Sequence, residues 1–534
     1  MFDVYYLTAS LLVTWSLYRI CSIGRRPKRY PPGPPTLPVL GNLHMMPKED
    51  PHLQFQQWAK EYGPIYSLML GTKVMVVLNK DHVIKDLVDK KGATYGSRPD
   101  LYIGQTLISG GHRLLMMRHG PTYRIQRKLV HIALNVNKAV AYLPYQEMEN
   151  RQLMYDLMMT PSGLLEHLRR FSSSLITSVV FGFRWKTFDE PRLQEVFSLF
   201  DNFMRLNATG GAALADFYPI LRSAPAWLSP IQQEAIEHHD VELPFMMKFW
   251  LEAKEKILNK AIPIDSCTCG VIVKAQQQER FSDPFAAYIS GSLVEAGSDT
   301  TSSSLYGFVQ AMLVYPDVQR AVQAEIDKVI GYNRYPTMED MPSLPYVRAC
   351  VKETHRWMPT AILGGFPHAT TEDDHYNGYL IPKDATILLN TWTIHRDPER
   401  HPNPELFQPE RYFGDDTNSF ESANLPDVSQ RDHMNFGAGR RFCPGVHVAD
   451  RSMLLAIARL LWAFNIKPKK DADGNDMLPK QDDFIQRFVV HPNRYECEIT
   501  PRSEKKAQII KEEWEKVSQN LDEAGQYIVN PIRG

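Results

Sequence analysis

The chain has 534 residues, 43% of them hydrophobic and 23% charged, so it is long enough to enclose a cofactor within a large core. Lys and Arg number 60 and Asp and Glu number 61, which leaves a formal net charge of −1. This balance argues against a nucleic-acid-binding protein, which normally carries a clearly basic domain. The six cysteines lack the close spacing of a secreted disulfide framework, which favours a reducing compartment.

The N-terminus predicts a membrane anchor. Residues 4–18 carry no charge and are rich in Leu, Val, Tyr and Trp. A basic cluster follows them: Arg19, Arg25, Arg26, Lys28 and Arg29. The run is slightly short for a bilayer-spanning helix, which needs about 20 mostly apolar residues, and the alternative of a cleaved signal peptide lacks a small-residue cleavage site. We expect a retained anchor over residues 1–23, with a lumenal N-terminus and a cytosolic body, because basic residues stay on the cytosolic side.

The next segment, Pro31-Pro-Gly-Pro-Pro35, is too rich in proline for a helix or a sheet. It predicts a stiff, extended spacer inside a basic, proline-rich hinge over residues 24–38. The body, residues 39–502, shows helical patterns broken by short β-like pieces at Ile65–Leu70 and residues 74–78, with no internal repeat and no second linker. One large, mainly helical domain is expected there.

Two further segments are assigned no chemistry. Cys267-Thr-Cys269 would suit a metal ion, but no second pair of cysteines or histidines lies at zinc spacing, so we predict a loop. The chain becomes charged near its C-terminus, where a tail over residues 503–534 is predicted to contain an exposed amphipathic helix at residues 505–521.

A helical pattern over residues 285–314 contains an unusual polar motif. Residues 296–301 read Ala-Gly-Ser-Asp-Thr-Thr. Glycine weakens a helix by about 1 kcal/mol, and Ser or Thr side chains can bond back to the preceding turn, so we expect a local opening of the helix. On its own the motif is more typical of an ordinary helix with a solvated Asp299 and a flexible Gly297.

Glu353 and Arg356 lie three residues apart, so they share one face of a predicted helix. Alone, such a pair is a common surface ion pair worth well under about 1 kcal/mol. Arg411, in the sequence Pro-Glu-Arg-Tyr, supplies a second arginine further along the chain.

The most informative stretch is residues 436–445, which read Phe-Gly-Ala-Gly-Arg-Arg-Phe-Cys-Pro-Gly. It places Cys443 in a glycine-rich loop beside two arginines, and residues 446–461 follow with apolar residues at helical spacing. This is the setting that a haem-ligating thiolate requires. A lone cysteine can also be an inert, buried residue, so the whole pattern carries the argument.

Four neighbours of the cysteine suit that chemistry. A thiolate that holds iron needs backbone N–H groups aimed at the sulfur, and Gly439 and Gly445 let the backbone fold closely around it. Arg441 suits a charge-assisted hydrogen bond with a haem propionate, because its guanidinium is planar. Phe436 would shield the sulfur from water.

Residues 436–445 resemble the FxxGxRxCxG signature of the cytochrome P450 family of haem-thiolate monooxygenases, and they match it at every fixed position. Residues 296–301 resemble the oxygen-binding stretch of that family's central helix. Glu353 and Arg356, with Arg411, resemble its ExxR helix and PERF-like partner. The resemblance spans about residues 31–500. The overall pattern is similar to that of microsomal family members from fungal secondary metabolism. It implies a mainly α fold with small β-sheets (α+β), as one large haem-binding domain.

The resemblance also implies residue roles. Cys443 would be the axial ligand of haem b. Asp299 and Thr300 match the proton-delivery pair of the family. Glu353, Arg356 and Arg411 would form a buried structural network beneath the haem, which resists removal of any member.

Further haem-propionate contacts are implied at Arg98, Arg127 and His368. Tyr123 stands where the family's WxxxR pattern has Trp, so that hydrogen bond depends on the phenol, which can still donate. For Arg98 and His368 the alternative is a solvated loop cation or a satisfied polar residue.

By the same resemblance, apolar residues line a substrate pocket: residues 362–366 and 484–489, Met116 and Met117. They could equally belong to the core. Their character suggests a lipophilic organic substrate.

The chain needs an external source of electrons. Gly437-Ala-Gly439 begins like a dinucleotide-binding motif, but Phe442 stands where the final glycine belongs and no strand leads into it. The resemblance implies a membrane-bound, NADPH-dependent flavoprotein reductase as partner and a site on the endoplasmic reticulum membrane.

We therefore predict a haem-thiolate monooxygenase that uses dioxygen to hydroxylate a lipophilic substrate in secondary metabolism. Two alternatives stay open. The same haem could perform oxidative phenol coupling or ring closure. A membrane-anchored haem carrier or sensor is the other, although it would not need the proton-delivery pair Asp299 and Thr300.

Overall fold

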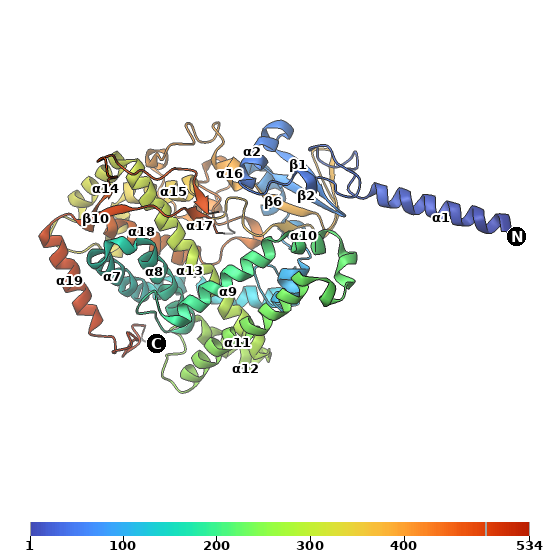
Figure 1. The fold of residues 1–534 in the computed structure, drawn as a ribbon. Helices are drawn as coiled ribbons and strands as arrows, with labels where there is room; N and C mark the ends of the chain where they lie inside the picture. Colours follow the sequence, from blue (N-terminus) through green and yellow to red (C-terminus); the bar gives the residue numbers. More distant parts are fainter. Residues whose placement is uncertain (1, 486–488, 533–534) are drawn as a thin grey trace.

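The body of the protein is built from helices that surround one long central helix, α13, with small β-sheets at its periphery (Figure 1). The computed structural model describes residues 2–485 and 489–532. The longer helices in the first half of the chain are α1 (Phe2–Ser22), α2 (Pro51–Tyr62), α5 (Pro121–Leu134), α7 (Leu143–Met159), α8 (Leu164–Phe181), α9 (Pro191–Ala208) and α11 (Pro230–Leu258). Those in the second half are α12 (Thr268–Glu279), α13 (Asp283–Val314), α14 (Pro316–Val329), α15 (Pro345–Trp357), α18 (Val446–Ala463) and α19 (Glu504–Ser518).

Shorter helices and the strands connect these elements. The short helices are α3 (Asp81–Ile84), α4 (Gly92–Tyr95), α6 (Val136–Ala141), α10 (Gly210–Phe217), α16 (Thr391–His395) and α17 (Ser419–Ala423). The strands are β1 (Ile65–Leu70), β2 (Lys73–Leu78), β3 (His368–Ala369), β4 (Asp374–Tyr376), β5 (Tyr379–Ile381), β6 (Thr386–Leu389), β7 (Phe464–Pro468), β8 (Phe484–Ile485), β9 (His491–Pro492) and β10 (Cys497–Pro501).

The largest described sheet has the strand order β1-β2-β6-β3. β1 and β2 are antiparallel, with Ile65 opposite Leu78, while β6 is parallel to β2 and antiparallel to β3. β1 and β2 lie where the sequence predicts β structure, whereas β6 and β3 were not predicted. Both faces of β1 are buried, because Phe55 and Trp58 of α2 cover one face and a second apolar cluster that includes Val83 covers the other. The sheet thereby fixes β3, which carries His368.

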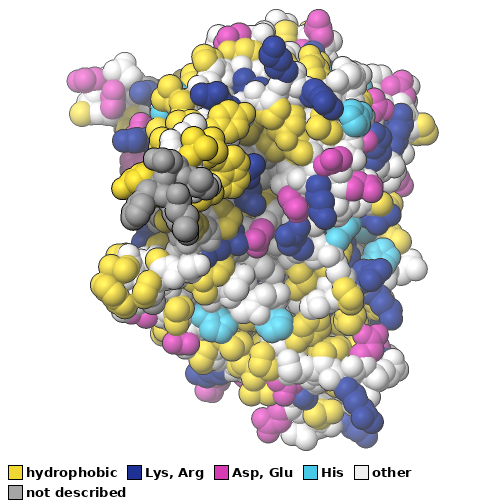
Figure 2. All heavy atoms as spheres, turned by 90° about the vertical axis from the view of Figure 1, so that its right-hand side faces the viewer, with side chains coloured by type: hydrophobic (Ala, Val, Ile, Leu, Met, Phe, Trp, Pro, Cys, Tyr) yellow, Lys and Arg dark blue, Asp and Glu magenta, His cyan; other side chains and the backbone are white. Residues whose placement is uncertain are grey.

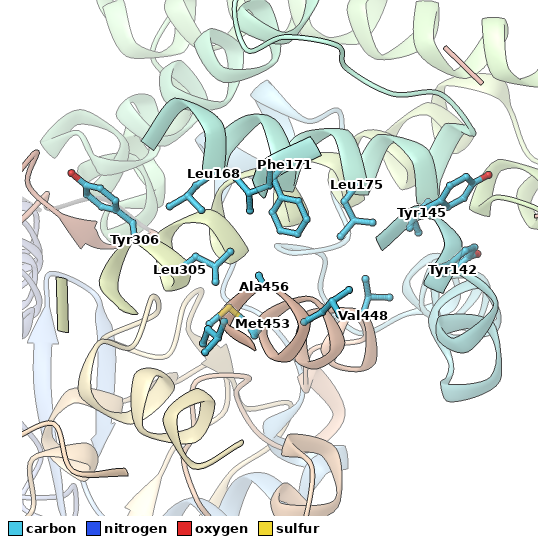
Figure 3. Packing of buried hydrophobic residues seen from close by; sticks show 14 of the residues in the cluster. Tyr142, Tyr145, Leu168, Phe171, Leu175, Leu305, Tyr306, Val448, Met453 and Ala456 are labelled. Atoms are coloured by element: carbon cyan, nitrogen blue, oxygen red, sulfur yellow. The ribbon is translucent and has the colours of Figure 1, made fainter. Parts of the chain in front are cut away.

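The main hydrophobic core lies between α8, α13 and α18 (Figure 3). Leu168, Phe171 and Leu175 of α8 point toward Leu305 of α13 and Met453 of α18. Each of these side chains is at most 4% exposed, so each contributes roughly 1.5–3 kcal/mol of hydrophobic burial. The core therefore holds together the central helix and the helix that follows Cys443.

Gly297 of α13 allows this close approach. A Cβ atom at this position would lie 2.5 Å from the side chain of Ile176 in α8, and Ser172 of α8 donates a hydrogen bond to the Gly297 carbonyl at 2.6 Å. The hydroxyl of Thr300 does bond back to the Ala296 carbonyl, at 2.8 Å. The helix is nevertheless unbroken from Asp283 to Val314, so the expected local opening is not observed.

The N-terminal helix α1 projects away from the body (Figure 1). Within the described part of the chain, no helix is both long and apolar enough to cross a bilayer, so the structure does not support the predicted spanning anchor. The proline-rich segment is also not a free spacer. The Ser67 amide of β1 donates to the Pro32 carbonyl at 2.7 Å, and Arg26 donates to the carbonyls of Gly33 and Pro34 at 2.7 and 2.8 Å. These hydrogen bonds hold the segment against β1.

The cysteine pair at residues 267–269 departs from the prediction of a loop. Cys267 is the N-cap of α12, and Cys269 lies in its first turn. Both thiols are buried, and a buried cysteine packs as a small hydrophobic residue, which is why the motif can begin a helix.

The C-terminal tail packs against the body. α19 lies near the predicted residues 505–521, and the rings of Trp514 and Tyr155 of α7 stack with centroids 5.8 Å apart. Beyond it, the Tyr527 hydroxyl lies 3.0 Å from Ser178 Oγ of α8, and Arg184 Nη1 donates to the Gly525 carbonyl at 3.1 Å. The tail is therefore a structural part of the α7 and α8 region.

Replacement of Tyr527 tests this role of the tail. We expect Tyr527→Ala to lower the free energy of unfolding by about 2–4 kcal/mol, because it removes a packed ring and a hydrogen bond. Tyr527→Phe should lose about 1 kcal/mol, since only the hydroxyl is removed. Thermal unfolding measures both variants, and an unchanged midpoint for Tyr527→Ala would mean that the tail only rests on the surface.

Candidate active site

Cys443 lies in the loop that leads into α18. Its amide donates to the Phe436 carbonyl at 3.0 Å, which closes the loop. Burial raises the pKa of the Cys443 thiol, while the N–H groups of Gly445 and Val446 and the charge of Arg127 oppose that shift. A thiol of this kind ionises on binding a metal, whose charge favours the thiolate. The sulfur is therefore shielded and prepared for a metal ion.

The two glycines beside the sulfur have different roles. Gly445 directs its N–H at the sulfur, and a Cβ atom there would lie 3.8 Å from the sulfur, which is ordinary contact. Gly439 has a φ of +59°, and a Cβ atom there would lie 2.4 Å from the Val88 carbonyl oxygen. The Gly439 amide donates to Asp89 at 2.9 Å. Gly439 thus fits the loop against residues 85–89 and not against the sulfur.

Phe436 lies beside the sulfur loop and packs against two histidines. Its ring centroid is 5.1 Å from that of His355 in α15 and 5.6 Å from that of His433. Burial and His433 hold the pKa of His355 well below its usual value, so this ring stays neutral. His355 was missed in the sequence because nothing near it along the chain signals contact with residue 436.

Three arginines gather on the other side of the loop and bond to backbone carbonyls. Arg441 donates to the carbonyls of Gly96 at 2.7 Å and Met117 at 2.5 Å. Arg98 donates to Leu115 at 2.9 Å and Phe366 at 2.5 Å, and Arg127 donates to Phe442 at 2.5 Å. These contacts connect the Cys443 loop with α5 and with residues 96–117, and they connect residue 98 with the segment that precedes β3.

The positive charge in this group is not neutralised by acids. Burial, with Arg441 and Arg127 nearby, lowers the pKa of Arg98 to about 9. Burial and Arg127 lower the pKa of Arg441 to about 10. Among the described residues, no carboxylate contributes to the pKa shift of either arginine. An anionic group such as a pair of haem propionates would stabilise all three cations.

Tyr123, His119 and His368 lie beside these three arginines. The guanidinium carbon of Arg441 lies 3.8 Å from the centroid of the Tyr123 ring, and the Tyr123 hydroxyl donates to the Arg440 carbonyl at 3.2 Å. Tyr123 therefore orients Arg441 by a cation–π contact. His368 Nδ1 lies 3.0 Å from the Tyr95 carbonyl oxygen, and its ring is buried. The ring of His119, which the sequence did not suggest, lies tilted beside Tyr123 with the ring centroids 5.1 Å apart, and burial and the surrounding arginines lower its pKa to about 4.

The central helix presents one open face near its polar motif. Ala296 is exposed and Thr300 is partly exposed, although most of α13 is buried, and residues four apart share a helical face. Asp299 lies to the side of that face, is 8% exposed, and accepts a hydrogen bond from Arg169 of α8 at 3.3 Å. Arg169 in turn lies 3.4 Å from His491 Nε2. The sequence did not suggest Arg169, since only the fold brings α8 beside the motif.

The structure brings Glu353, Arg356 and Arg411 together. Arg356 makes two hydrogen bonds of 2.7 Å to the Glu353 carboxylate, and both side chains are fully buried. Arg411 Nε and the Gln408 amide reach the same carboxylate at 3.3 and 2.7 Å. Burial lowers the pKa of Arg356, but the bonds to Glu353 outweigh it and raise the pKa overall. The Glu353 carboxylate thus accepts hydrogen bonds from two arginines and one backbone amide.

The apolar residues expected around a substrate separate into two groups. Met116 packs with Phe203 and Phe366 in a cluster beside α9 and α11, and Met117 is also buried. Phe484 packs against Trp392 with ring centroids 6.1 Å apart. Residues 486–488 of the same expected stretch lie outside the described residues.

Together the site residues fit a haem group. They provide a shielded sulfur at the start of α18, a cationic group without acids, and an open face of α13. Thiolate ligation and salt-bridged carboxylates are what a haem requires of a protein.

Comparisons with known proteins agree with this arrangement. The family described as Cytochrome P450 matches residues 31–499. The cytochrome P450 monooxygenase virE of Hypocrea virens is 47% identical over 516 residues, 96% of this chain and 93% of virE. The cytochrome P450 monooxygenase fogE of Aspergillus ruber is 48% identical over 508 residues, 95% of this chain and 93% of fogE. A zebrafish cytochrome P450 structure with progesterone has a TM-score of 0.70 and 24% identity, covering 84% of this chain and 99% of its own.

The chain belongs to the cytochrome P450 family, and it is a haem-dependent monooxygenase. Its cofactor is haem with a cysteine thiolate as axial ligand, and the reaction requires dioxygen, a substrate and a redox partner. The predicted family, the mainly α fold and the likeness to fungal monooxygenases are confirmed. The alternative of a haem carrier or sensor without turnover is not supported.

Loss of Arg356 tests the buried network. We expect Arg356→Leu to yield haem-free or insoluble protein, because removing one member of a buried ion pair costs about 3–5 kcal/mol. The matched control is Arg334→Leu, which removes an arginine from a solvent-exposed pair with Asp340 and should cost less than about 1 kcal/mol. The ratio of haem to protein absorbance measures both. Equal haem content in the two variants would contradict a structural role for Arg356.

Proposed function

We propose that Cys443 is the axial thiolate and that the enzyme hydroxylates a lipophilic organic substrate. The observation that carries this proposal is the Cys443 sulfur itself, with the N–H groups of Gly445 and Val446 directed at it, next to arginines that lack acidic partners. Hydrogen bonds from backbone amides moderate the electron donation of such a sulfur.

When bound, the haem supplies dioxygen activation and oxidation of the substrate. The residues of the chain control protons. The Thr300 hydroxyl lies on the open face of α13, where it can hand a proton to reduced oxygen. Asp299 exchanges protons with solvent through the Arg169 side, because Arg169 is itself only partly buried. Asp299 would thus return a proton to the Thr300 hydroxyl after each turnover.

The cationic group would hold the haem propionates. Arg441, Arg98 and Arg127 would exchange hydrogen bonds with backbone carbonyls for stronger ones with carboxylates. Tyr123 would act on the propionates through Arg441, since its hydroxyl already bonds to a backbone carbonyl. His368 would contact a propionate through Nε2, because its Nδ1 bonds to the Tyr95 carbonyl.

The buried apolar residues near Arg98 favour a lipophilic substrate. Met116 and Phe366 belong to one apolar cluster, and they flank the arginines that would bind the propionates. The high identity to fungal monooxygenases supports a role in secondary metabolism. Oxidative coupling or ring closure by the same haem is the second candidate, and product analysis separates it from hydroxylation.

We also propose an NADPH-dependent flavoprotein reductase as the redox partner and the endoplasmic reticulum membrane as the site of both proteins. Residues 1–23 would serve as the anchor, residues 24–38 as the hinge, residues 39–502 as the catalytic domain and residues 503–534 as the tail.

Exposed apolar side chains support attachment to a membrane. Tyr6 and Trp15 of α1 are 72% and 60% exposed, and Ile220 and Trp227, in turns after α10, are 82% and 76% exposed. Tyr218, next to those turns, donates to the Val39 carbonyl, so they lie near the base of α1. Figure 2 shows hydrophobic side chains gathered on the face from which α1 projects. Such a patch favours contact with lipid.

The proposed ligand is tested by Cys443→Ser. We expect the dithionite-reduced wild type to give a strongly red-shifted Soret band with carbon monoxide, and the variant to lose it while retaining its fold, because serine donates far less electron density to iron. Circular dichroism and thermal unfolding verify the fold. A red-shifted band that persists in Cys443→Ser would assign the ligand to another residue.

The proton-delivery role is tested by Thr300→Ala with Thr300→Ser as its matched control. In the presence of reductase and NADPH, Thr300→Ala should release more hydrogen peroxide per NADPH consumed, because reduced oxygen leaves before it is protonated productively. Thr300→Ser keeps the hydroxyl and should behave like the wild type. Haem content should be equal in all three proteins. An unchanged peroxide yield in Thr300→Ala would remove Thr300 from the proton path.

A further inference from the structure

A group of buried charged and polar side chains lies beside α13 and includes Glu295 of that helix. Arg113 forms ion pairs with Glu295 of α13 and with Glu242 of α11, the latter at 2.6 Å. Glu242 also lies 3.1 Å from His238 Nε2 and accepts a hydrogen bond from the Tyr288 hydroxyl at 3.2 Å. Every member is at most 9% exposed. We call these five residues the roof cluster.

The roof cluster is directly connected to both the cationic group and the open face of α13. Arg113 is followed directly by Leu114, and the carbonyls of Leu114 and Met117 accept hydrogen bonds from Arg441 at 3.4 and 2.5 Å. Glu295 directly precedes Ala296, which lies on the open face. The ion pair of Arg113 and Glu295 therefore joins the segment that contacts Arg441 to the part of α13 that carries the open face.

Aromatic and apolar residues cover the roof cluster. The guanidinium carbon of Arg113 lies 3.9 Å from the centroid of the Phe203 ring in α9, and Phe203 packs in one cluster with Met116 and Phe366. α11 packs against α13, and α9 packs against α11 (Figure 1). A cavity of about 30 Å³ is lined by Glu242 and Glu295, so it has room for one or two water molecules beside these carboxylates.

Stability does not explain a cluster of this kind. Replacement of buried ion networks by apolar residues is often neutral or stabilising, so their retention points to a specific role. The cluster holds two carboxylates for one guanidinium, and Arg113 uses Nε on Ser109 and one N–H on each glutamate. Burial raises the pKa of Glu295 to about 7, and Glu242 adds to this effect while Arg113 opposes it. Glu295 therefore gains from a further hydrogen-bond donor.

We propose that Glu295, positioned by Arg113, is a substrate-recognition residue that accepts a hydrogen bond from a neutral hydroxyl group of the substrate. The substrate class is accordingly an alcohol or a phenol with an otherwise apolar skeleton. A carboxylate or phosphate at this place would be repelled by Glu242 and Glu295. This inference rests on the proposed function, because it requires haem bound at Cys443 beneath the roof cluster.

The test uses ligands that differ by one hydroxyl group. 4-Phenylimidazole coordinates haem iron, and its three isomers with a hydroxyl on the phenyl ring carry that group to different places above the haem. Titration of the haem-loaded wild type, followed by the shift of the Soret band, gives a dissociation constant for each ligand. We expect one isomer to bind about 10-fold more tightly than the parent, the effect of a hydrogen bond to a charged acceptor.

Variants at residue 295 then assign this preference. Glu295→Gln should reduce it, and Glu295→Leu should bring the preferred isomer within about 2-fold of the parent, because the acceptor is gone. Arg113 keeps Glu242 in both variants, so no buried cation is left unpaired. The matched control is Glu195→Gln, on the exposed surface of α9, which should retain the full preference. The binding of the parent ligand should be equal in all four proteins.

Each remaining outcome has a distinct meaning. If the parent binds but no hydroxyl isomer is preferred, or if the preference survives in Glu295→Leu, the inference is wrong and the proposed function stands. If the wild type takes up no haem, or binds the parent without a Soret shift, the proposed function fails and the inference fails with it. The carbon monoxide spectrum of each variant verifies that the haem site is intact.

Discussion

The positive charge around Arg441 is the constraint on which the active site depends. Three arginines, Arg98, Arg127 and Arg441, converge on one place, and backbone carbonyls are their hydrogen-bond partners there. Carbonyl dipoles satisfy the N–H groups but do not neutralise the charge, which is why the pKa values of Arg98 and Arg441 fall. An anionic cofactor supplies the negative charge that the protein does not place beside these arginines. Cofactor binding and local stability are therefore linked.

Buried charge is handled in the opposite way on the other side of the Cys443 loop. Glu353 and Arg356 pair through two hydrogen bonds, and the remaining N–H groups of Arg356 reach carbonyls that include His395 and Leu406. No external ligand is needed there, because the charges of Glu353 and Arg356 neutralise each other. The protein thus combines two groups of buried charges. The Glu353–Arg356 group is paired within the protein, whereas the arginine group is completed by a ligand. The first can hold the loop in place while the second accommodates the haem.

The sequence predicted the local features well. β1 and α13 follow from patterns within a few residues, and Glu353 and Arg356 meet because a helix brings residues three apart to one face. The role of Gly439 was not predictable, because its contact is with Val88, more than three hundred residues away. The roof cluster was missed for the same reason. Its members come from distant segments, and neither Arg113 nor Glu295 is unusual within its own stretch of sequence.

The docked tail has a consequence for the order of folding. The backbone amide of Arg184 bonds to Gln526, a residue 342 positions further along the chain. During synthesis from the N-terminus, α7 and α8 emerge long before this partner exists. The buried group of Glu149, Arg170 and Arg184 is therefore covered only after residues 525–527 have been synthesised. A chain that terminates before these residues would leave this charged group accessible to the chaperones and proteases of the cell.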